Sequence, residues 1–272
     1  MNLYVKKREN GMKVDVLISC MNQTDFTIID KSNLSQAHVV VVNQNKESNS
    51  VLVRNERQKM VNTTTKGLSV SRNMAVGHSD ADICLIADDD EIFVNNVCDV
   101  VRSAYEKYVD ADVIIFKIAN FREKFHGKTR KLKKIDLLKV SSQQISFKRD
   151  SIKNVQFDIN LGAGTPNGAG EENKFLLDCK KQGLKILYVP LVIAEVVENS
   201  GSTWFDGYNE HYFFNRGRTT RYIYGFAFSL IYAIYFAVIH KKDIQSFSRI
   251  KAFKLMVKGI LKNDIGKGKT KK

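Results

Sequence analysis

An apolar run, Ile83–Ala87, leads directly into four acidic residues at positions 88–91, and this junction constrains the fold more than any other feature. A run rich in Ile and Leu predicts a buried strand, on which side chains two positions apart point to the same side. Asp88 and Asp90 are therefore expected to project together from the strand's C-terminal end, where open α/β sheets bind ligands. Such carboxylates repel each other unless a cation or protons neutralise them, and hard oxygens favour Mg²⁺ or Mn²⁺ and hence a phosphate-bearing substrate. The alternative is an acidic, solvated turn.

Between residues 13 and 118, short β-rich runs alternate with helix-compatible stretches. This alternation predicts an α/β fold with a Rossmann-like, mainly parallel sheet flanked by helices. A basic stretch at residues 122–139 has no clean period and predicts a loop or excursion, and the Gly content of residues 161–170 predicts a loop. We expect strands at residues 14–19, 38–43, 83–87, 113–118, 144–149 and 185–189, and helices at 68–77, 95–108 and 171–182.

Composition bounds the class of protein. The 272 residues are 43% hydrophobic, which supports a sizeable core and argues against global disorder. The four cysteines show no CxxC spacing, so neither a disulfide framework nor a zinc site is indicated, and a reducing cytosol fits. The first ten residues lack the apolar core of a signal peptide, so we expect a cytoplasmic protein.

The positive charge is concentrated at the C-terminal end. Residues 221–272 contain 12 Lys/Arg and 2 Asp/Glu, a net +10 out of +14 for the whole chain. This distribution argues against a nucleic-acid groove in the core fold. It favours a tail addressed to an anionic surface.

The tail also has a membrane-like hydropathy pattern. Residues 222–239 contain no charged side chain, and eighteen residues are at the short limit of a membrane span. Beyond them, apolar residues recur at helical spacing among lysines, as in helices that lie in the lipid interface. Positive clusters flank the apolar run on both sides, so the positive-inside rule favours an in-plane or re-entrant helix over a simple crossing. A buried core helix or an oligomer contact is the alternative.

Three further segments accompany the acidic residues in order along the chain. Residues 19–23, Ser-Cys-Met-Asn-Gln, come at the end of the first expected strand. Residues 67–73 end in an Arg-Asn pair, and residues 170–172 give a Gly-Glu-Glu start to a helix. In this order the segments resemble the family 2 glycosyltransferases of the GT-A fold over roughly residues 13–196. The resemblance implies transfer of a sugar from a nucleotide-diphosphate donor to an acceptor hydroxyl, with Mg²⁺ or Mn²⁺ as cofactor.

Carried over by position, the resemblance implies a role for each matching residue. Glu172 falls at the place of the general base, which takes the proton of the acceptor hydroxyl in an inverting transfer, and Glu171 is the second candidate. Capping of the helix by either glutamate is the alternative, because the macrodipole favours acids in a first turn. For Arg72, the alternative to nucleotide contact is an exposed helix charge. The implied donor-binding residues are Cys20, Met21, Asn22, Asn43, Arg72, Asp88 and Asp89, and the implied metal ligands are Asp88, Asp90 and Glu195.

The chain departs from the family pattern at three positions. Asn43 ends the second strand where many relatives carry an Asp that reads the base, so the nucleotide stays open. The base position is Glu172 rather than Asp, which lengthens its reach by one methylene. Glu195 stands near the place of a metal-binding His in relatives. It would substitute as an oxygen ligand, or the metal would rely on Asp90, the diphosphate and waters.

Two segments after the last core strand, residues 200–205 and 209–214, combine aromatic with polar side chains. This combination suits a sugar, which presents C–H faces and hydroxyl rims. Trp204 and His211 are the candidates for acceptor binding, with ordinary packing residues as the alternative.

We therefore expect a metal-dependent, inverting glycosyltransferase with a GT-A domain at residues 1–217 and a membrane-associating helical tail, of hydrophobic and amphipathic helices, at 218–272. The expected partners are a nucleotide-diphosphate sugar, a glycan or lipid-linked acceptor and the anionic inner face of the cell membrane, but no nucleic acid. A lipid-linked acceptor suggests bacterial surface polysaccharide synthesis. Two alternatives remain. One is a nucleotidyltransferase, but residues 20–24 lack the Gly-rich, basic signature of that class. The other is a non-catalytic pseudoenzyme that binds a nucleotide sugar.

Overall fold

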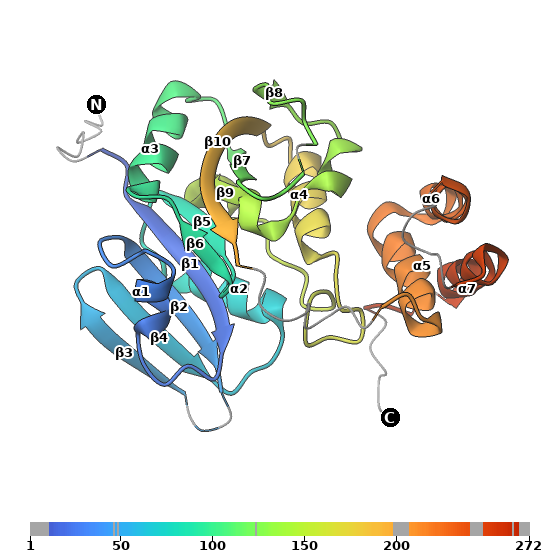
Figure 1. The fold of residues 1–272 in the computed structure, drawn as a ribbon, viewed down its shortest axis with the longest axis horizontal. Helices are drawn as coiled ribbons and strands as arrows, with labels where there is room; N and C mark the ends of the chain where they lie inside the picture. The colour runs from blue at the N-terminus through green and yellow to red at the C-terminus, as the bar shows by residue number, and fades with distance from the viewer. Residues whose placement is uncertain are drawn as a thin grey trace, which may run out of the picture. The chain divides into compact units, whose positions relative to one another are not determined.

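The structure, a computed structural model, describes residues 11–45, 47, 49–122, 124–197, 207–239, 247–262 and 264–266 (Figure 1). Contacts group the chain into two compact units. The sheet unit consists of Met1–Phe157 and Phe175–Asn199, and the helical unit consists of Asp158–Lys174 and Ser200–Lys272. The boundary expected from sequence, between residues 217 and 218, thus differs from this division and falls inside a helix.

The sheet unit contains one mixed β-sheet. Its strand order is β3-β4-β2-β1-β5-β9-β7-β10-β6, and β8 pairs with β10. The strands β4, β2, β1 and β5 run parallel, as do β7 and β10, whereas β9 is antiparallel to both β5 and β7. The strands are β1 (Val14–Met21), β2 (His38–Gln44), β3 (Ser50–Asn55), β4 (Gln58–Thr63), β5 (Ile83–Ala87), β6 (Glu91–Phe93), β7 (Val113–Ile118), β8 (Arg130–Lys131), β9 (Ile145–Lys148) and β10 (Ile186–Val196).

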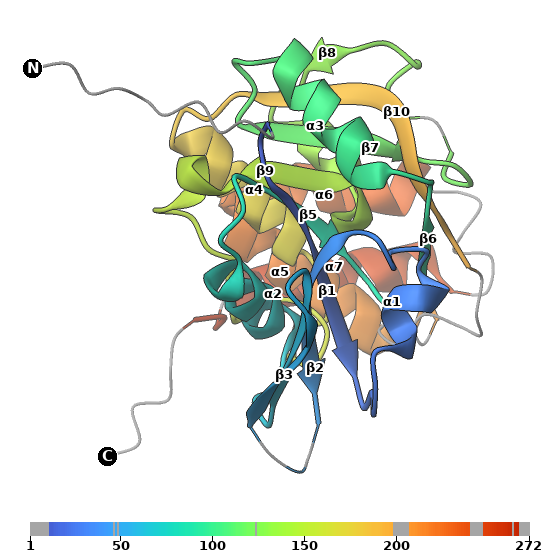
Figure 2. The same cartoon turned by 90° about the vertical axis from the view of Figure 1, so that its left-hand side faces the viewer.

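Both faces of the central strands β1, β2, β5 and β7 are buried, because successive side chains on these strands enter opposite cores. Leu85 packs with helices α1 (Thr27–Lys31) and α3 (Val97–Lys107), while its neighbour Ile86 packs on the side of α2 (Leu68–His78) and α4 (Glu171–Lys181). Figure 2 shows α3 covering the sheet from one side. Short 3₁₀ turns η1 (Asp136–Lys139), η2 (Ser142–Gln144) and η3 (Arg149–Ile152) lie around β9.

The expected α/β fold is confirmed. The strands at 83–87 and 113–118 and the helix at 68–77 agree with β5, β7 and α2 to within one residue. The β3–β4 hairpin and the short strand β6 were not expected. The last core strand, expected at 185–189, continues to Val196 and there pairs antiparallel with β6.

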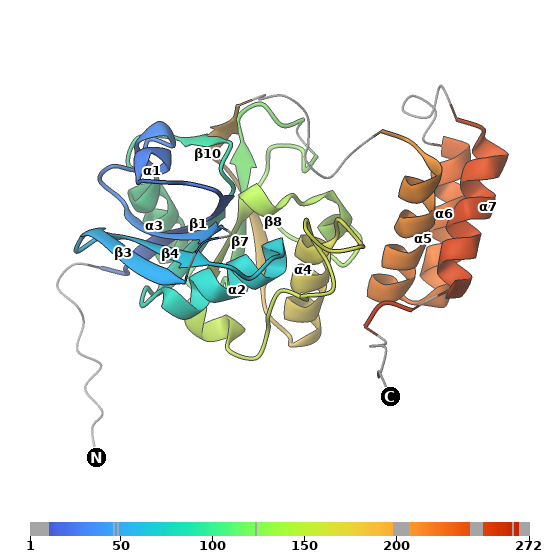
Figure 3. The ribbon, with the colours of Figure 1, turned by 90° about the horizontal axis from the view of Figure 1, so that it is seen from below.

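The helical unit contains α5 (Glu210–Tyr224), α6 (Phe226–Ile239) and α7 (Arg249–Lys262), which run side by side (Figure 3). Their shared core consists of Phe213, Ala233, Phe236, Ala252, Met256 and Ile260. The apolar stretch 222–239 does not form one helix, because Gly225 adopts a φ of 86° and ends α5. Within the described residues, no helix is both long and apolar enough to cross a membrane.

Helices α5 and α7 approach closely at two glycines. A Cβ on Gly217 would lie 2.0 Å from the carbonyl oxygen of Met256, and a Cβ on Gly259 would lie 2.0 Å from that of Phe214. Any larger residue at either position would overlap backbone atoms of the other helix, so the crossing requires both glycines.

One face of α6 is apolar and exposed. Ile231, Ile234 and Tyr235 are 66%, 54% and 45% exposed, whereas Ala233 and Phe236 on the opposite face are buried. On α7, the exposed side chains include Lys254 and Lys258. The sequence-based alternative of a buried core helix therefore describes only one side of α6.

Candidate active site

The acidic residues after β5 lie at the carboxyl end of the parallel strands, as expected. Asp88 is held from two sides: Nη2 of Arg72 lies 2.8 Å from its Oδ1, and the Ser142 hydroxyl donates to its Oδ2 at 3.2 Å. The carboxylate of Asp88 keeps 23% of its surface exposed, while the Arg72 side chain keeps 1%. Asp88 is thus an anchored carboxylate, and the alternative of a freely solvated turn is wrong for this residue.

Arg72 is buried because its helix packs on an aromatic pair. Its guanidinium lies 5.6 Å from the ring centroid of Phe157, which stacks on Phe175 at 4.2 Å. The neighbouring Asn73 amide pairs with both backbone groups of Phe157, at 2.8 and 2.9 Å. The alternative of an exposed helix charge is therefore wrong. Nucleotide contact by Arg72 stays a prediction, while the structure shows it holding Asp88.

Glu91 also belongs to the site, although no role was expected for it from the sequence. Its side chain is buried, and its Oε2 accepts the backbone N–H of Asp88 at 2.7 Å. Burial, followed by the charge of Asp88, raises the pKa of Glu91 well above its usual value. The sequence does contain a sign of this. Apolar residues return at Ile92 and Phe93, which indicates a second short strand that starts at Glu91, the fourth acidic residue.

Asp89 and Asp90 complete the cluster. Loss of hydration, followed by the charge of Asp88, raises the pKa of both carboxyls, and Asp90 also raises that of Asp89. A hydrogen bond from Gln143 partly offsets the effect at Asp90. Its buried Oδ1 has no hydrogen-bond partner in the described part of the chain. Crowded carboxylates with an unused buried oxygen fit a hard divalent cation such as Mg²⁺ or Mn²⁺.

Glu195 lies on the strand that pairs with β6, the short strand that Glu91 begins. It is exposed on β10 and pairs with Ile92, whereas Glu91 pairs with Val196, so Glu195 and Glu91 point to opposite faces of the sheet. Among the residues that the structure describes, no three or more His, Cys, Asp or Glu are arranged to hold a metal ion. Glu195 therefore does not share a face with Glu91, and its role as a metal ligand stays a prediction.

The residues expected beside the base lie at the neighbouring strand ends. Asn43 is fully buried, and its amide bonds both backbone groups of Gln23, at 2.7 and 2.9 Å, so it holds the loop after β1. In that loop Met21 is 56% exposed and Asn22 has a left-handed φ of 55°. Burial, followed by the charge of Asp89, raises the pKa of Cys20 to about 12, so its thiol stays protonated at neutral pH.

Glu171 and Glu172 begin α4 and belong to the helical unit. The loop before them is fixed to α5: Tyr222 donates to Asp158 at 2.6 Å, and Arg218 donates to Asn167 at 3.0 Å. A Cβ on Gly170 would lie 2.9 Å from the Ile223 side chain, so the start of α4 abuts this same helix.

Arg216 lies one turn before Thr219 on the face of α5 that meets Gly170. Its guanidinium donates to the Tyr232 hydroxyl at 2.6 and 3.2 Å and lies 5.5 Å from that ring's centroid. Burial opposes the charge of Arg216, yet Tyr232, Tyr212 and the charge of Glu172 leave its pKa raised. Arg216 therefore lies within the electrostatic reach of Glu172.

One of the two acceptor candidates lies among the described residues. His211 is exposed on α5, and its Nε2 lies 2.7 Å from the Asn215 amide nitrogen. Trp204 lies outside the described residues.

Comparison with known proteins places the fold. No protein-family model and no curated protein matches the chain. Solved structures of S. aureus TarS 1-349 do match, at 11% identity and a TM-score of 0.52 over 96% of this chain and 74% of that one. The same TarS segment in complex with UDP-GlcNAc gives 12% identity and a TM-score of 0.55, with equal coverage. In complex with UDP it gives 12% and 0.53, over 93% of this chain and 72% of TarS. At identities this low, a structural match shows only a shared fold. The match to TarS confirms the GT-A-like architecture of this chain.

Proposed function

We propose that this chain is a metal-dependent glycosyltransferase that takes its sugar from a nucleotide-diphosphate donor. The observation that carries the proposal is the buried Arg72, which holds Asp88 beside three further acidic side chains at the carboxyl end of β5. Ligands bind at this edge in open α/β sheets. TarS, which shares the fold, has been solved with UDP and with UDP-GlcNAc, and this supports a nucleotide sugar as donor.

Asp90, with Asp88 beside it, is the residue that we assign to the metal ion. Its unused buried oxygen and the surrounding negative charge support the assignment. A bound Mg²⁺ or Mn²⁺ would supply stabilisation of the charge on the departing diphosphate. Ser142 and Gln143 orient Asp88 and Asp90 through their hydrogen bonds, and substrate oxygens and water would complete the coordination shell.

The remaining donor contacts are assigned along the neighbouring strand ends. Asp88 and Asp89 would bind the ribose or the sugar. Cys20, Met21 and Asn22 would border the base. Asn43 would contribute chiefly by holding this loop, because its amide already bonds Gln23.

Glu172 is the residue that we assign as general base, with Glu171 as the alternative. Inverting transfer requires a carboxylate that removes the proton of the acceptor hydroxyl as its oxygen attacks the anomeric carbon. The charge of Arg216 favours the ionised form of a nearby carboxylate, which is the form that a base needs.

The acceptor that we propose is a hydroxyl of a glycan on a lipid carrier, at the inner face of a bacterial membrane and in surface polysaccharide synthesis. The exposed apolar side of α6 and the exposed lysines of α7 support contact with an anionic lipid surface. Trp204 and His211 are proposed to contact the acceptor sugar.

The decisive experiment incubates the full chain with a panel of nucleotide-diphosphate sugars, with and without Mg²⁺ or Mn²⁺, and identifies the released product. We expect metal-dependent release of a nucleoside diphosphate from one donor. Release of pyrophosphate instead would identify a nucleotidyltransferase. Tight donor binding without any turnover, in the presence of a range of acceptors, would identify a binding protein.

A further inference from the structure

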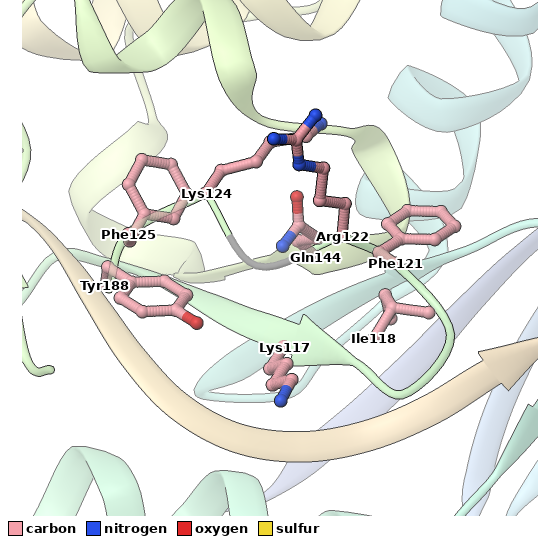
Figure 4. A pocket seen from close by; sticks show the side chains of 8 residues that line it. All are labelled: Lys117, Ile118, Phe121, Arg122, Lys124, Phe125, Gln144 and Tyr188. Carbon is pink, nitrogen blue, oxygen red and sulfur yellow. The ribbon is translucent and has the colours of Figure 1, made fainter. Parts of the chain in front are cut away.

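A cationic hollow lies at the C-terminal end of β7. Its enclosed space is small, about 10 Å³, which is room for one water-sized oxygen group, and the rest of the hollow opens to solvent. Figure 4 shows Gln144 near its centre, with the Phe125 and Tyr188 rings on one side and Phe121 on the other. The Phe125 and Tyr188 ring centroids are 4.6 Å apart, so this side is a packed wall. Its charged lining residues are Lys117, Arg122 and Lys124.

The described residues bring little negative charge to this hollow. Within the described part of the chain no acidic residue lines it, and Lys117 and Arg122 have neither an ion pair nor a hydrogen bond. The Lys124 ammonium donates only to the carbonyl oxygen of Lys139, at 2.9 Å. Partial burial, followed by the charge of Lys139, lowers the pKa of Lys124, and an anion beside this ammonium would oppose both effects. Glu123 lies outside the described residues.

The hollow is connected to the acidic cluster by three consecutive residues of η2. Ser142 bonds Asp88 and Gln143 bonds Asp90, whereas the Gln144 amide donates to the Phe116 carbonyl at 2.8 Å and lines the hollow. One turn, η2, therefore supplies both the side chains that hydrogen-bond the acidic cluster and a side chain that lines the hollow.

The sheet order separates this hollow from the expected nucleotide edge. The loop after β1 and the residue Asn43 of β2 lie on one side of β5, whereas β7 and β10 lie on the other, beyond β9. We expect the base of the donor near β1 and its diphosphate at the acidic cluster. The β7 side of the sheet would then be free for the second substrate. The hollow begins at the last residues of β7, where ligands of α/β sheets bind.

We infer that this hollow binds an anionic oxygen group, a phosphate or a carboxylate, of the acceptor. The inference rests on the proposed function, since it places a second substrate beside the donor. The basic stretch at residues 122–139 extends the same charge, with 8 Lys/Arg against 2 Asp/Glu. Such a track would raise the local concentration of an acceptor that carries several negative groups.

The test uses inorganic phosphate as the probe, with acetate in a parallel arm, and calorimetry of the full chain. The variant K117Q/R122Q/K124Q removes the three lining charges. The matched control K128Q/K133Q/K134Q removes three exposed charges from the same basic stretch outside the hollow. Titrations are repeated with the donor site saturated by UDP and Mg²⁺.

We expect the lining variant to weaken phosphate binding about tenfold or more, as for lost charge-assisted hydrogen bonds, and the control to change it less than about threefold. Saturating UDP should leave wild-type phosphate binding unchanged. Equal losses in both variants, or competition between phosphate and UDP, would overturn the inference. If acetate binds more strongly than phosphate, the anion site is supported and the group that it binds is a carboxylate.

A separate readout distinguishes this inference from the proposed function. UDP binding and metal-dependent hydrolysis of nucleotide sugars should be the same in both variants as in the wild type. Phosphate binding that depends on the lining charges, in a protein that hydrolyses no nucleotide sugar, supports the anion site and contradicts the transferase.

Discussion

The Nη2 atom of Arg72 lies 2.8 Å from Oδ1 of Asp88, and this contact joins a fully buried cation to a carboxylate that reaches solvent. The aromatic pair of Phe157 and Phe175 fixes the buried end. The position of Asp88 is therefore set from inside the protein before any ligand arrives. This kind of preorganisation favours binding of a charged ligand.

Arg72→Met should destabilise the fold strongly. Removing one partner of a buried pair leaves Asp88 uncompensated, and we expect a loss of about 3 kcal/mol or more in the free energy of unfolding. The control is Arg54→Met, which breaks the exposed ion pair with Asp30 and should cost about 1 kcal/mol or less. Urea unfolding measures both. Similar losses in the two variants would contradict the structural role of Arg72.

Asp90→Asn should separate metal binding from folding. It removes a carboxylate whose ionised form is disfavoured in the folded protein, so the metal-free melting temperature should rise. Mg²⁺ should no longer strengthen UDP binding. In the control Asp80→Asn, which alters an exposed carboxylate paired with Lys13, calorimetry should show the wild-type effect of Mg²⁺. The same effect in Asp90→Asn would remove Asp90 from the metal site.

Glu91→Gln should change how stability depends on pH. The pKa of Glu91 is raised in the folded protein, so the folded state binds this proton more tightly than the unfolded chain. The contribution of this proton to the free energy of unfolding is full below the pKa of Glu91 in the unfolded chain, about 4.3. It is lost as the pH rises through the raised pKa of Glu91 in the folded protein. Without metal, the variant should therefore be more stable than wild type at neutral pH, with the difference shrinking on acidification. A constant difference across thermal scans from pH 4 to pH 8 would be inconsistent with this assignment.

Glu172→Gln should leave donor binding intact and reduce transfer by about 10²-fold or more, as for a lost general base. Glu171→Gln is the matched control, because it changes the adjacent first-turn glutamate with the same loss of charge and should retain most of the activity. Steady-state kinetics with the identified donor and acceptor, beside calorimetry with UDP, give both readouts. If the Glu171 variant is the inactive one, the two assignments are exchanged.

Ile231→Ser/Ile234→Ser should weaken binding to vesicles that contain phosphatidylglycerol roughly tenfold or more, because two apolar side chains no longer enter the lipid. The control Val51→Ser/Val53→Ser alters two exposed valines of β3 and should have no effect. Binding of the wild type should also weaken with salt. Equal vesicle sedimentation of both variants would argue against the apolar side of α6 as the contact.

Sequence patterns predicted the elements whose burial is uniform. Ile83–Ala87 is a continuous apolar run bounded by polar residues, and its strand was located correctly. The β3–β4 hairpin was missed because Val51 and Val53 are exposed at a sheet edge and resemble a loop. The end of α5 at Gly225 was missed because the apolar run continues across it, and hydropathy carries no information on φ.

For the candidate site, the sequence indicated which residues to consider but not which contacts they make. The acidic residues and Arg72 were recognised from their order along the chain. The burial of Arg72 was not, since it depends on Phe157 and Phe175, which are distant in sequence. The attachment of the loop before Glu171 to α5 was likewise invisible, because it rests on pairs such as Asp158 with Tyr222, separated by 64 residues.

The attachment of this loop to α5 limits how the protein can be dissected. Deleting the chain after residue 217 would strip away Arg218, Thr219, Tyr222 and Ile223, the side chains that grip the segment leading into Glu172. A truncated protein without activity would then say nothing about lipids. Surface point changes on α6 separate the two effects, and so do chimeras that exchange the outward-facing side chains while keeping all of α5.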